Sequence, residues 1–261
     1  MLDEIEPLLR ELCAVAARET MPRFRMRLDV DNKEDGSNGF DPVTEADREA
    51  ERAIRRYLAE HCPDHGILGE EEAPLNPDAE YCWHIDPVDG TRAFICGLPS
   101  WGTLIGLARE GKAIAGVMHQ PFTGEMFLAD GETTWAIRGD ERKALSTSGN
   151  TELGDAKLMT TTPFLFADDI IDGYRNLEAR VRLARYGFDC YAYAMVAAGH
   201  IDLVVESSLK SYDIAALIPV IEQAGGVVTT WTGENAISGG SIVAAATPSL
   251  HQAALELLDR N

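Results

Sequence analysis

Apolar residues in the first half of the chain recur first at helical spacing and then in short runs. Spacings of three and four residues predict amphipathic helices over residues 2–19 and in the segment that follows Thr44. The short runs are bounded by turn-forming residues, which predicts β-strands. These predicted strands are residues 66–69, 81–85, 102–108, 113–119, 125–129 and 133–138. The last four pair in order as two hairpins, so this half is predicted to contain an antiparallel sheet.

The second half is predicted to alternate strands with helices. A polar stretch over residues 140–155 separates two predicted halves, residues 1–145 and 146–261. Strands are predicted at 157–161, 181–185, 201–206, 226–231 and 241–246, and helices at 163–177, 189–198, 213–224 and 249–258. Hairpins in one half, and strands crossed by helices in the other, predict an α+β or α/β fold class.

The composition narrows the classes of partner and compartment. The chain has 43 acidic and 23 basic residues among its 261, a net charge of −20. This charge argues against a nucleic-acid or anionic-membrane partner, because both need cationic surfaces. No signal peptide pattern follows Met1, and no apolar run reaches membrane-spanning length. The five widely spaced cysteines contain no C-x-x-C pair, which indicates neither a zinc site nor a disulfide framework. We therefore expect a soluble cytoplasmic protein.

The stretch W-H-I-D-P-V-D-G-T-R-A-F places candidate chemistry at the end of a predicted strand. Pro87 fixes its own φ angle and favours an extended conformation at Asp86, so the strand is predicted to stop at Asp86 and turn. The turn would aim the Asp86 and Asp89 carboxylates at one point. Gly90 and Thr91 would then open a short helix whose free N–H groups suit a phosphate. Carboxylates beside an anion site imply cations between them, so we predict a metal-dependent phosphoryl site.

Other acids lie at predicted element ends, and each also has a purely structural interpretation. Glu70 directly follows a predicted strand, although it also begins a run of glutamates that could face water. Asp213 opens a predicted helix and could be its N-cap, while Asp47 could complete a capping box with Thr44. Taken together, the acids at element ends favour a cation site: Glu70, Asp86, Asp89 and Asp213. Their hard oxygen donors, without clustered histidine or cysteine, select Mg²⁺ or Mn²⁺ rather than zinc.

Four motifs in order resemble those of the inositol monophosphatase family. They are V-T-E-A-D at residues 43–47, G-E-E at 69–71, D-P-V-D-G-T at 86–91, and Y-D-I-A-A followed by E-Q-A-G-G within 212–226. The resemblance runs from about Leu2 to the C-terminus. It implies a Mg²⁺-dependent, lithium-sensitive phosphatase with a layered α-β-α-β-α sandwich of the inositol monophosphatase and sugar phosphatase type. It also implies a homodimer.

The resemblance implies roles for individual residues. The implied metal ligands, for two or three Mg²⁺ ions with Mn²⁺ as the alternative, are Glu70, Asp86, Asp89, Asp213 and the backbone carbonyl of Val88. The N–H groups of Gly90 and Thr91 would bind phosphate oxygens. The Thr91 hydroxyl, hydrogen-bonded to Asp47, would orient and help to deprotonate a metal-bound water for in-line attack on phosphorus.

Further segments are similar to the histidinol-phosphatase branch of this family. They are Y-G-F-D-C-Y-A-Y at residues 186–193, the stretch 206–213, R-A-F-I-C-G-L-P-S-W-G-T at 92–103 and Q-P-F-T-G-E at 120–125. Histidinol phosphate has a cationic organic end, and Asp189 and Glu206 could supply carboxylates for it. Asp189 could equally be the N-cap of the helix that follows, and an inositol pocket would also use Glu206. Arg185 could contact the substrate or pair with a surface acid.

The predicted function is a Mg²⁺-dependent phosphomonoesterase that hydrolyses the small-molecule ester histidinol phosphate in histidine biosynthesis. The alternative is an inositol-1-phosphate or broader sugar-phosphate phosphatase on the same scaffold, and a third hypothesis is a non-catalytic metal- or phosphate-binding regulator. The loop at residues 31–39 could close over the site as a lid, or be an ordinary solvated connection. The chain departs from the family pattern in a lengthened loop before Asp41 and in Phe188, where a smaller residue is more usual.

Overall fold

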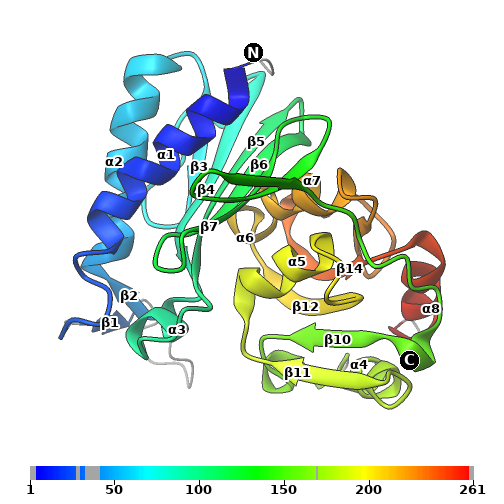
Figure 1. Cartoon of the computed structure of the whole chain (residues 1–261). Coiled ribbons are helices and arrows are strands. Elements are labelled where there is room, and N and C mark those ends of the chain that lie inside the picture. Colours follow the sequence, from blue (N-terminus) through cyan, green and yellow to red (C-terminus); the bar gives the residue numbers. More distant parts are fainter. Residues whose placement is uncertain (1–3, 28–29, 33–41, 169, 259–261) are drawn as a thin grey trace.

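The chain forms two large β-sheets held between three layers of helices (Figure 1). The computed structural model describes residues 4–27, 30–32, 42–168 and 170–258. The outer layer on the first sheet is α1 (Ile5–Thr20) and α2 (Glu45–His61); the middle layer is α5 (Asp189–Ala197), α6 (Ser211–Ile214) and α7 (Leu217–Glu222); the outer layer on the second sheet is α4 (Ile171–Glu178) and α8 (Pro248–Leu258). This order confirms the predicted α-β-α-β-α sandwich.

The first sheet has seven strands in chain order. They are β3 (Gly66–Gly69), β4 (Tyr81–Asp89), β5 (Gly102–Arg109), β6 (Lys112–Gln120), β7 (Glu125–Ala129), β8 (Thr134–Arg138) and β9 (Glu141–Ala144). β3 and β4 are parallel and every other pair is antiparallel, which confirms both predicted hairpins. Successive residues of β5, such as Leu104 and Ile105, face different cores. Because helices cover both faces, the strands read as continuous apolar runs.

The second sheet has five strands in the order β11-β10-β12-β14-β13. They are β10 (Lys157–Thr160), β11 (Leu183–Tyr186), β12 (Leu203–Leu209), β13 (Val227–Thr230) and β14 (Gly240–Ala245). The pairs β10–β11 and β10–β12 are parallel, and the other two are antiparallel. Each large sheet comes from one side of the predicted boundary at residues 145–146, but the middle core mixes side chains from both sides. The division into two domains stays a prediction.

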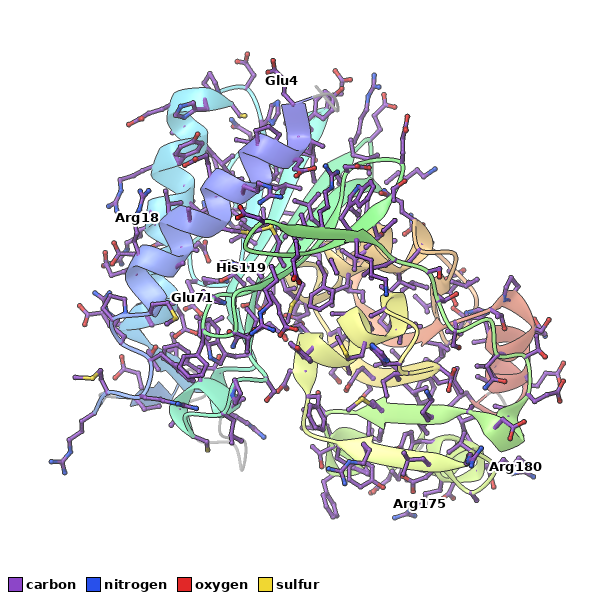
Figure 2. The ribbon with its side chains drawn as sticks, viewed as in Figure 1. Glu4, Arg18, Glu71, His119, Arg175 and Arg180 are labelled. Carbon is purple, nitrogen blue, oxygen red and sulfur yellow. The ribbon has the colours of Figure 1, made fainter. Side chains whose placement is uncertain are left out.

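Smaller elements connect the sheets and helices. The short helix α3 (Thr91–Ile95) directly follows β4, and β1 (Val30–Asn32) pairs with β2 (Pro42–Thr44) just before α2. Charged side chains such as Arg18 and Arg175 project outward from the helical layers (Figure 2). All five cysteines are free thiols. In the described part of the chain, no helix is both long and apolar enough to cross a membrane.

Two predicted helices were wrong in their extent. The helix predicted at residues 163–177 is a short 3₁₀ helix followed by α4, because Phe166 between them is extended and stacks its ring on Tyr174, at 4.5 Å between centroids. The helix predicted at residues 213–224 is divided into α6 and α7. The break lies at residues 215–216, because Pro219, the third residue of α7, lacks the N–H that a continuous helix would bond to the carbonyl of residue 215.

The strand and loop predictions also need correction. The predicted stop of the strand at Asp86 is wrong, because β4 continues to Asp89. The polar stretch predicted as a junction begins with a further strand, β9, whose residues are all exposed at the sheet edge. An exposed edge strand carries charged residues on both faces, so it lacks the apolar pattern of a strand. Residues 33–39 of the predicted lid lie outside the described residues.

A cross-strand glycine pair lets the middle helices approach the first sheet closely. Gly106 of β5 pairs with Gly116 of β6, and the backbone of Ala216 lies over both. A Cβ atom added at Gly116 would lie 2.4 Å from the Ala216 carbonyl oxygen, far inside contact distance. The two glycines therefore determine how deeply α6, which carries Asp213, sits against β4 and β5.

We expect Gly116→Ala to lower the free energy of unfolding by about 1–3 kcal/mol, because the α6–α7 backbone would have to shift. Urea unfolding followed by circular dichroism measures the loss. Gly154→Ala is the matched control, since nothing lies within 4 Å of a Cβ atom added there. Equal stability of the two variants would contradict the close approach.

Candidate metal and phosphate site

The end of β4 presents Asp86 and Asp89 on the same side through a bulge. In a regular strand, residues three apart point to opposite faces. Here Asp86 pairs with Leu104 of β5 while Asp89 pairs with Gly102, so β4 contains one residue more than its partner. This extra residue turns the Asp89 side chain to the side of Asp86. Pro87 cannot donate to the ladder, but its carbonyl accepts a hydrogen bond from the Thr103 hydroxyl at 2.8 Å.

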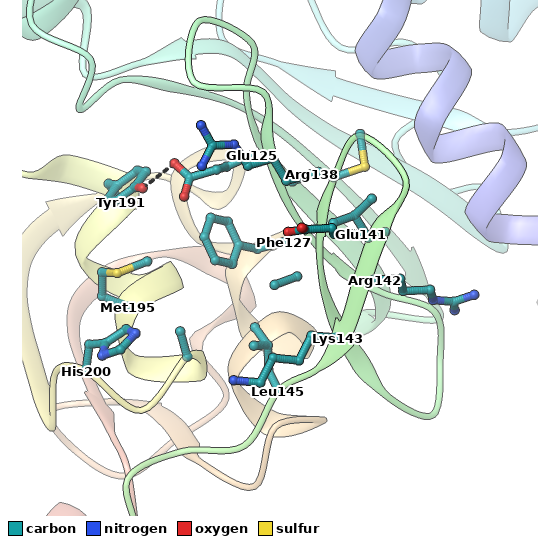
Figure 3. A pocket seen from close by; sticks show the side chains of 14 residues that line it. Glu125, Phe127, Arg138, Glu141, Arg142, Lys143, Leu145, Tyr191, Met195 and His200 are labelled. Carbon is teal, nitrogen blue, oxygen red and sulfur yellow. Dashed lines mark hydrogen bonds between the residues drawn. The ribbon is translucent and has the colours of Figure 1, made fainter.

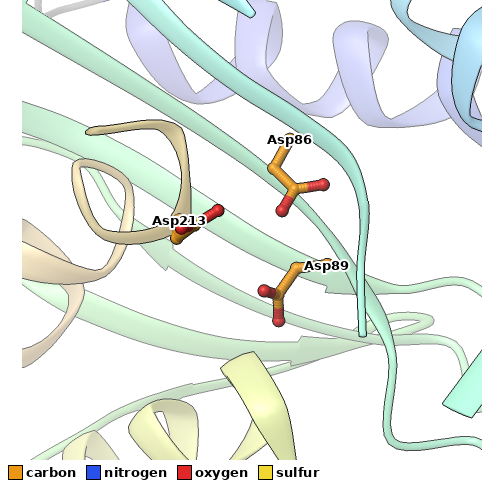
Figure 4. Close-up of side chains that lie close together, drawn as sticks. All are labelled: Asp86, Asp89 and Asp213. Carbon is orange, nitrogen blue, oxygen red and sulfur yellow. The ribbon is translucent and has the colours of Figure 1, made fainter. Parts of the chain in front are cut away.

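Asp213 of α6 completes a cluster of three carboxylates with Asp86 and Asp89 (Figure 4). One oxygen from each lies within 4.8 Å of the others. Asp213 also accepts a hydrogen bond from the backbone N–H of Lys210 at 2.6 Å, at the start of α6. The structural and metal-binding interpretations of Asp213 are therefore compatible, because a carboxylate has two oxygens.

Glu70 and Val88 belong to the same pocket. Together with the three clustered aspartates, they line a space of about 220 Å³. Glu70 follows β3, which is parallel to β4, so both strands end at the same edge of the sheet. The structure thus brings together all five predicted metal ligands.

The pocket concentrates negative charge away from water. Burial raises the pKa of Asp86 well above its ordinary value, and the charges of Glu70, Asp89 and Asp213 raise it further. The pKa of Asp89 is raised in the same way by burial, Asp189 and Asp213. Buried like charges are unfavourable unless protons or cations neutralise them. The hard oxygen donors fit Mg²⁺ or a similar divalent ion.

The start of α3 lies directly beside this cluster. Gly90 precedes the helix with a φ of 83°, a left-handed conformation that glycine adopts without strain. A Cβ atom at Gly90 would lie 3.0 Å from an Asp189 oxygen, so the glycine also permits the close approach of α5. The Thr91 hydroxyl lies 3.1 Å from the Val88 carbonyl and 3.3 Å from Asp47 Oδ1. Phosphate binding by the N–H groups of Gly90 and Thr91 stays a prediction.

Asp47 caps α2 and contacts Thr91 at the same time. Its Oδ2 accepts hydrogen bonds from the Thr44 N–H at 2.9 Å and the Thr44 hydroxyl at 2.5 Å, the predicted capping box. Its Oδ1 faces Thr91. Burial raises the pKa of Asp47 to about 6, against the lowering effect of the Thr44 hydrogen bonds, and the charge of Glu70 adds to the rise. Asp47 is therefore suited to accept a proton near neutral pH.

Asp189 and Glu206 line the other side of the pocket, joined by Thr161. The Thr161 N–H donates to Glu206 Oε1 at 2.5 Å, and the Thr161 hydroxyl donates to Asp189 Oδ1 at 3.3 Å. Burial raises the pKa of Glu206 to about 7, and burial also raises the pKa of Asp189. Asp189 is the first residue of α5 rather than its N-cap. Instead, Asp89 Oδ2 accepts from the N–H of Cys190 at 2.6 Å.

The basic residue that lines this pocket is Arg92 and not Arg185, the arginine predicted to contact the substrate. Arg185 is exposed on β11 and does not line the pocket, so its contact with substrate stays a prediction without support from its position. Among the described residues that line the pocket, Arg92 is the only lysine or arginine. Its charge opposes the rise in the pKa of Asp189. Arg92 directly follows the D-P-V-D-G-T motif, and that position in the first turn of α3 was the available signal.

A second cavity, of about 340 Å³, lies between β7–β9 and α5 (Figure 3). Arg138, Lys143 and His200 surround it, and none of the predicted site residues lines it. It contains no cluster of carboxylates comparable to the pocket at the end of β4. We therefore place the candidate site at the β4 pocket.

Comparison with known proteins agrees with this geometry. The model of the inositol monophosphatase family matches residues 1–261. The chain belongs to the inositol monophosphatase family. One relative, the bifunctional phosphatase IMPL2, chloroplastic, of Arabidopsis thaliana, is 40% identical over 247 residues, covering 90% of this chain and 69% of that protein. The histidinol-phosphatase of Chlorobaculum parvum is 34% identical over 233 residues, covering 88% and 87%. A solved structure of an inositol monophosphatase from Zymomonas mobilis has a TM-score of 0.87 at 38% identity and covers 98% of each chain.

Membership of the inositol monophosphatase family confirms the resemblance drawn from the four motifs and identifies the chain as a phosphatase of that family. The roles of individual residues stay predictions, although the geometry brings them together. The sequence motifs assigned no role to Arg92, Thr161 or the buried Glu51 of α2. Thr161 and Glu51 lie outside these motifs, whereas Arg92 opens the segment 92–103.

The raised carboxyl pKa values predict how metal-free stability depends on pH. Between its ordinary value of 4.5 and its folded value of about 7, Glu206 holds its proton in the folded state but loses it on unfolding. The raised pKa values of Asp86 and Asp89 change the stability in the same direction. The contribution of these three groups to metal-free stability is therefore greatest below this range and falls as the pH rises through it. We expect the unfolding temperature of chelator-treated protein to fall between about pH 5 and about pH 8.

Addition of MgCl₂ is expected to raise the unfolding temperature more at the higher pH, because ionised carboxylates bind the cation and protonated ones do not. Differential scanning fluorimetry measures both changes, with KCl at equal ionic strength as the control. An equal rise with KCl would contradict a specific cation site.

Proposed function

We propose that the protein is a Mg²⁺-dependent phosphomonoesterase that hydrolyses histidinol phosphate to histidinol and phosphate. The observation that carries this proposal is the carboxylate cluster of Asp86, Asp89 and Asp213 directly beside the Thr91–Asp47 pair. Such a cluster next to a hydroxyl with a basic partner suits the attack of water on a phosphate ester. The intact set of acids also argues against a non-catalytic regulator.

The residues of the pocket have different proposed roles in the reaction. Glu70, Asp86, Asp89, Asp213 and the Val88 carbonyl would hold two or three Mg²⁺ ions. When bound, the ions would supply positive charge to the phosphate and to the leaving oxygen. The N–H groups of Gly90 and Thr91 would orient the phosphate oxygens.

Thr91 and Asp47 would remove the proton from the attacking water. Thr91 Oγ1 would accept a proton from the water while it donates its own to Asp47 Oδ1, the neighbour at 3.3 Å. The water oxygen forms the new bond to phosphorus, the ester P–O bond breaks, and the departing alkoxide takes a proton from solvent. The raised pKa of Asp47, about 6, supports its part as proton acceptor.

Asp189 and Glu206 support the choice of histidinol phosphate over an uncharged polyol. Both acids line the same pocket as the metal cluster, and a protonated amine or imidazole would neutralise them. The histidinol-phosphatase of Chlorobaculum parvum is a relative in line with this choice. The inositol monophosphatase of Zymomonas mobilis supports the alternative, in which Glu206 would accept hydrogen bonds from inositol hydroxyls. A homodimeric assembly and a cytoplasmic location stay predictions.

We expect kcat/KM for histidinol phosphate to exceed kcat/KM for inositol 1-phosphate. Asp189→Asn removes a charge from the organic side of the pocket and should reduce kcat/KM for histidinol phosphate by about 10- to 100-fold, the loss typical of a hydrogen bond to a charged group. The value for inositol 1-phosphate should change much less. Asp172→Asn, at an exposed position on α4, is the control. Faster turnover of inositol 1-phosphate by the wild type would favour the alternative substrate.

Asp89→Asn tests the chemistry separately from the substrate. Asparagine keeps an oxygen for the N–H of Cys190 but removes the negative charge, so the fold should persist while hydrolysis of both esters is abolished. Phosphate release and the circular dichroism spectrum are measured together. Normal turnover by this variant, or undiminished turnover by the wild type in excess chelator, would contradict the mechanism.

A further inference from the structure

The turn that carries Glu70 donates backbone hydrogen bonds to a buried glutamate of α2, Glu51. Glu51 is completely buried. Its Oε2 accepts from the N–H of Glu71 at 2.7 Å, and its Oε1 accepts from the N–H of Glu72 at 3.2 Å. A carboxylate without solvent is stable only when hydrogen bonds and a counter-charge compensate it. Arg55, one turn further along α2, supplies that charge through a bond of 2.7 Å to Oε1.

The backbone on both sides of Glu70 is consequently anchored. The N–H of Glu70 itself donates to the carbonyl of Ile85, the residue before Asp86, at 3.2 Å. The next two N–H groups along the chain donate to Glu51. Arg55 also donates to the carbonyl of Glu72 at 3.1 Å. Three successive amides in this turn therefore have defined partners, which leaves the Glu70 backbone little freedom.

The same face of α2 reaches both parts of the proposed reaction. Asp47 and Glu51 are four positions apart and so lie on one face of the helix. Asp47 contacts Thr91, while Glu51 holds the turn of Glu70. Glu70 in turn lies close enough for its charge to act on both Asp47 and Asp86. One rigid helix thus sets the position of the proposed proton acceptor relative to a proposed metal ligand.

The Glu51 carboxylate packs directly against Gly69. A Cβ atom added at Gly69 would lie 2.0 Å from Glu51 Oε1 and 2.4 Å from its carboxyl carbon. The carboxylate therefore occupies the space that any other residue at position 69 would need. The G-E-E sequence and Glu51 form one structural unit, although Gly69 lies 18 positions after Glu51 in the chain.

We propose that Glu51 is a positioning residue for cation binding, which it promotes by holding the backbone of residues 70–72 so that Glu70 faces Asp86. It touches neither the substrate nor an ion in this role. The proposal rests on the proposed metal-dependent function, but its test includes metal binding and stability as readouts independent of turnover.

Glu51→Gln keeps the size of the side chain and removes its charge. Its amide nitrogen would meet either a backbone N–H or Arg55, so at least one donor loses its acceptor. We expect the dissociation constant for Mg²⁺, measured by isothermal titration calorimetry, to rise about 10- to 100-fold, as is typical when a group that orients a metal ligand is lost. Glu60→Gln, at an exposed position on the same helix, should leave it unchanged. A lower unfolding temperature of metal-free Glu51→Gln with unaltered Mg²⁺ affinity would overturn the proposal.

Two further variants distinguish the steric collision at position 69 from the loss of the hydrogen bonds to Glu51. Gly69→Ala alone should lower the unfolding temperature, because its methyl group collides with Glu51. Glu51→Ala removes the collision, so Gly69→Ala should lower the unfolding temperature less in the Glu51→Ala background than in the wild type. The Mg²⁺ affinity of the double variant should stay as low as that of Glu51→Ala, since no acceptor remains for the two amides. Recovery of wild-type Mg²⁺ affinity in the double variant would overturn the proposal even if the enzyme turned out to act on a different ester.

Discussion

Repulsion between buried and half-buried carboxylates is the constraint on which the rest of this structure depends. Asp86, Asp89 and Asp213 are close enough to share one ion, and burial together with mutual charge raises the pKa of Asp86 and Asp89. An arrangement of this kind opposes folding until protons or cations neutralise it. The three large apolar cores between the layers hold the acids together in spite of the repulsion. In the proposed function, the cluster would therefore be preorganised for cations before the substrate binds.

Backbone N–H groups reduce the repulsion by holding one oxygen of several of these acids. The pairs are Asp47 with Thr44, Asp86 with Val88, Asp89 with Cys190, Asp213 with Lys210, and Glu206 with Thr161. Hydrogen bonds of this kind stabilise the ionised form and fix the orientation of the carboxylate. Capping and metal binding are therefore not competing explanations for these residues. The hydrogen bond to the backbone fixes the orientation of the carboxylate, and a cation site requires carboxylates with a fixed orientation.

Two helices, α5 and α2, connect parts of the pocket that have different proposed roles. The N–H of Cys190 connects Asp89, a proposed metal ligand, to the start of α5, which carries Asp189, a proposed contact for the organic part of the substrate. On the opposite side, α2 connects Asp47 and the turn of Glu70 through Glu51. In the proposed function, the metal ligands come from the motifs that resemble the family's, whereas the contacts to the organic part of the substrate come from single residues such as Asp189. Such a division would let relatives share the scaffold and be named for different phosphate esters.

The sequence by itself determined the features that depend on near neighbours. Helical spacing identified α1 and α2, turn formers identified the two hairpins, and the D-P-V-D-G-T run identified the acids at the end of β4. Only the tertiary structure decided the bulge that aligns Asp86 with Asp89, since it depends on the register with β5. It also placed Arg92 in the pocket and Arg185 outside it, and it brought Asp89 to Cys190 across 101 residues. Such contacts join segments far apart in the chain, and local patterns carry no information about which distant segments packing will bring together.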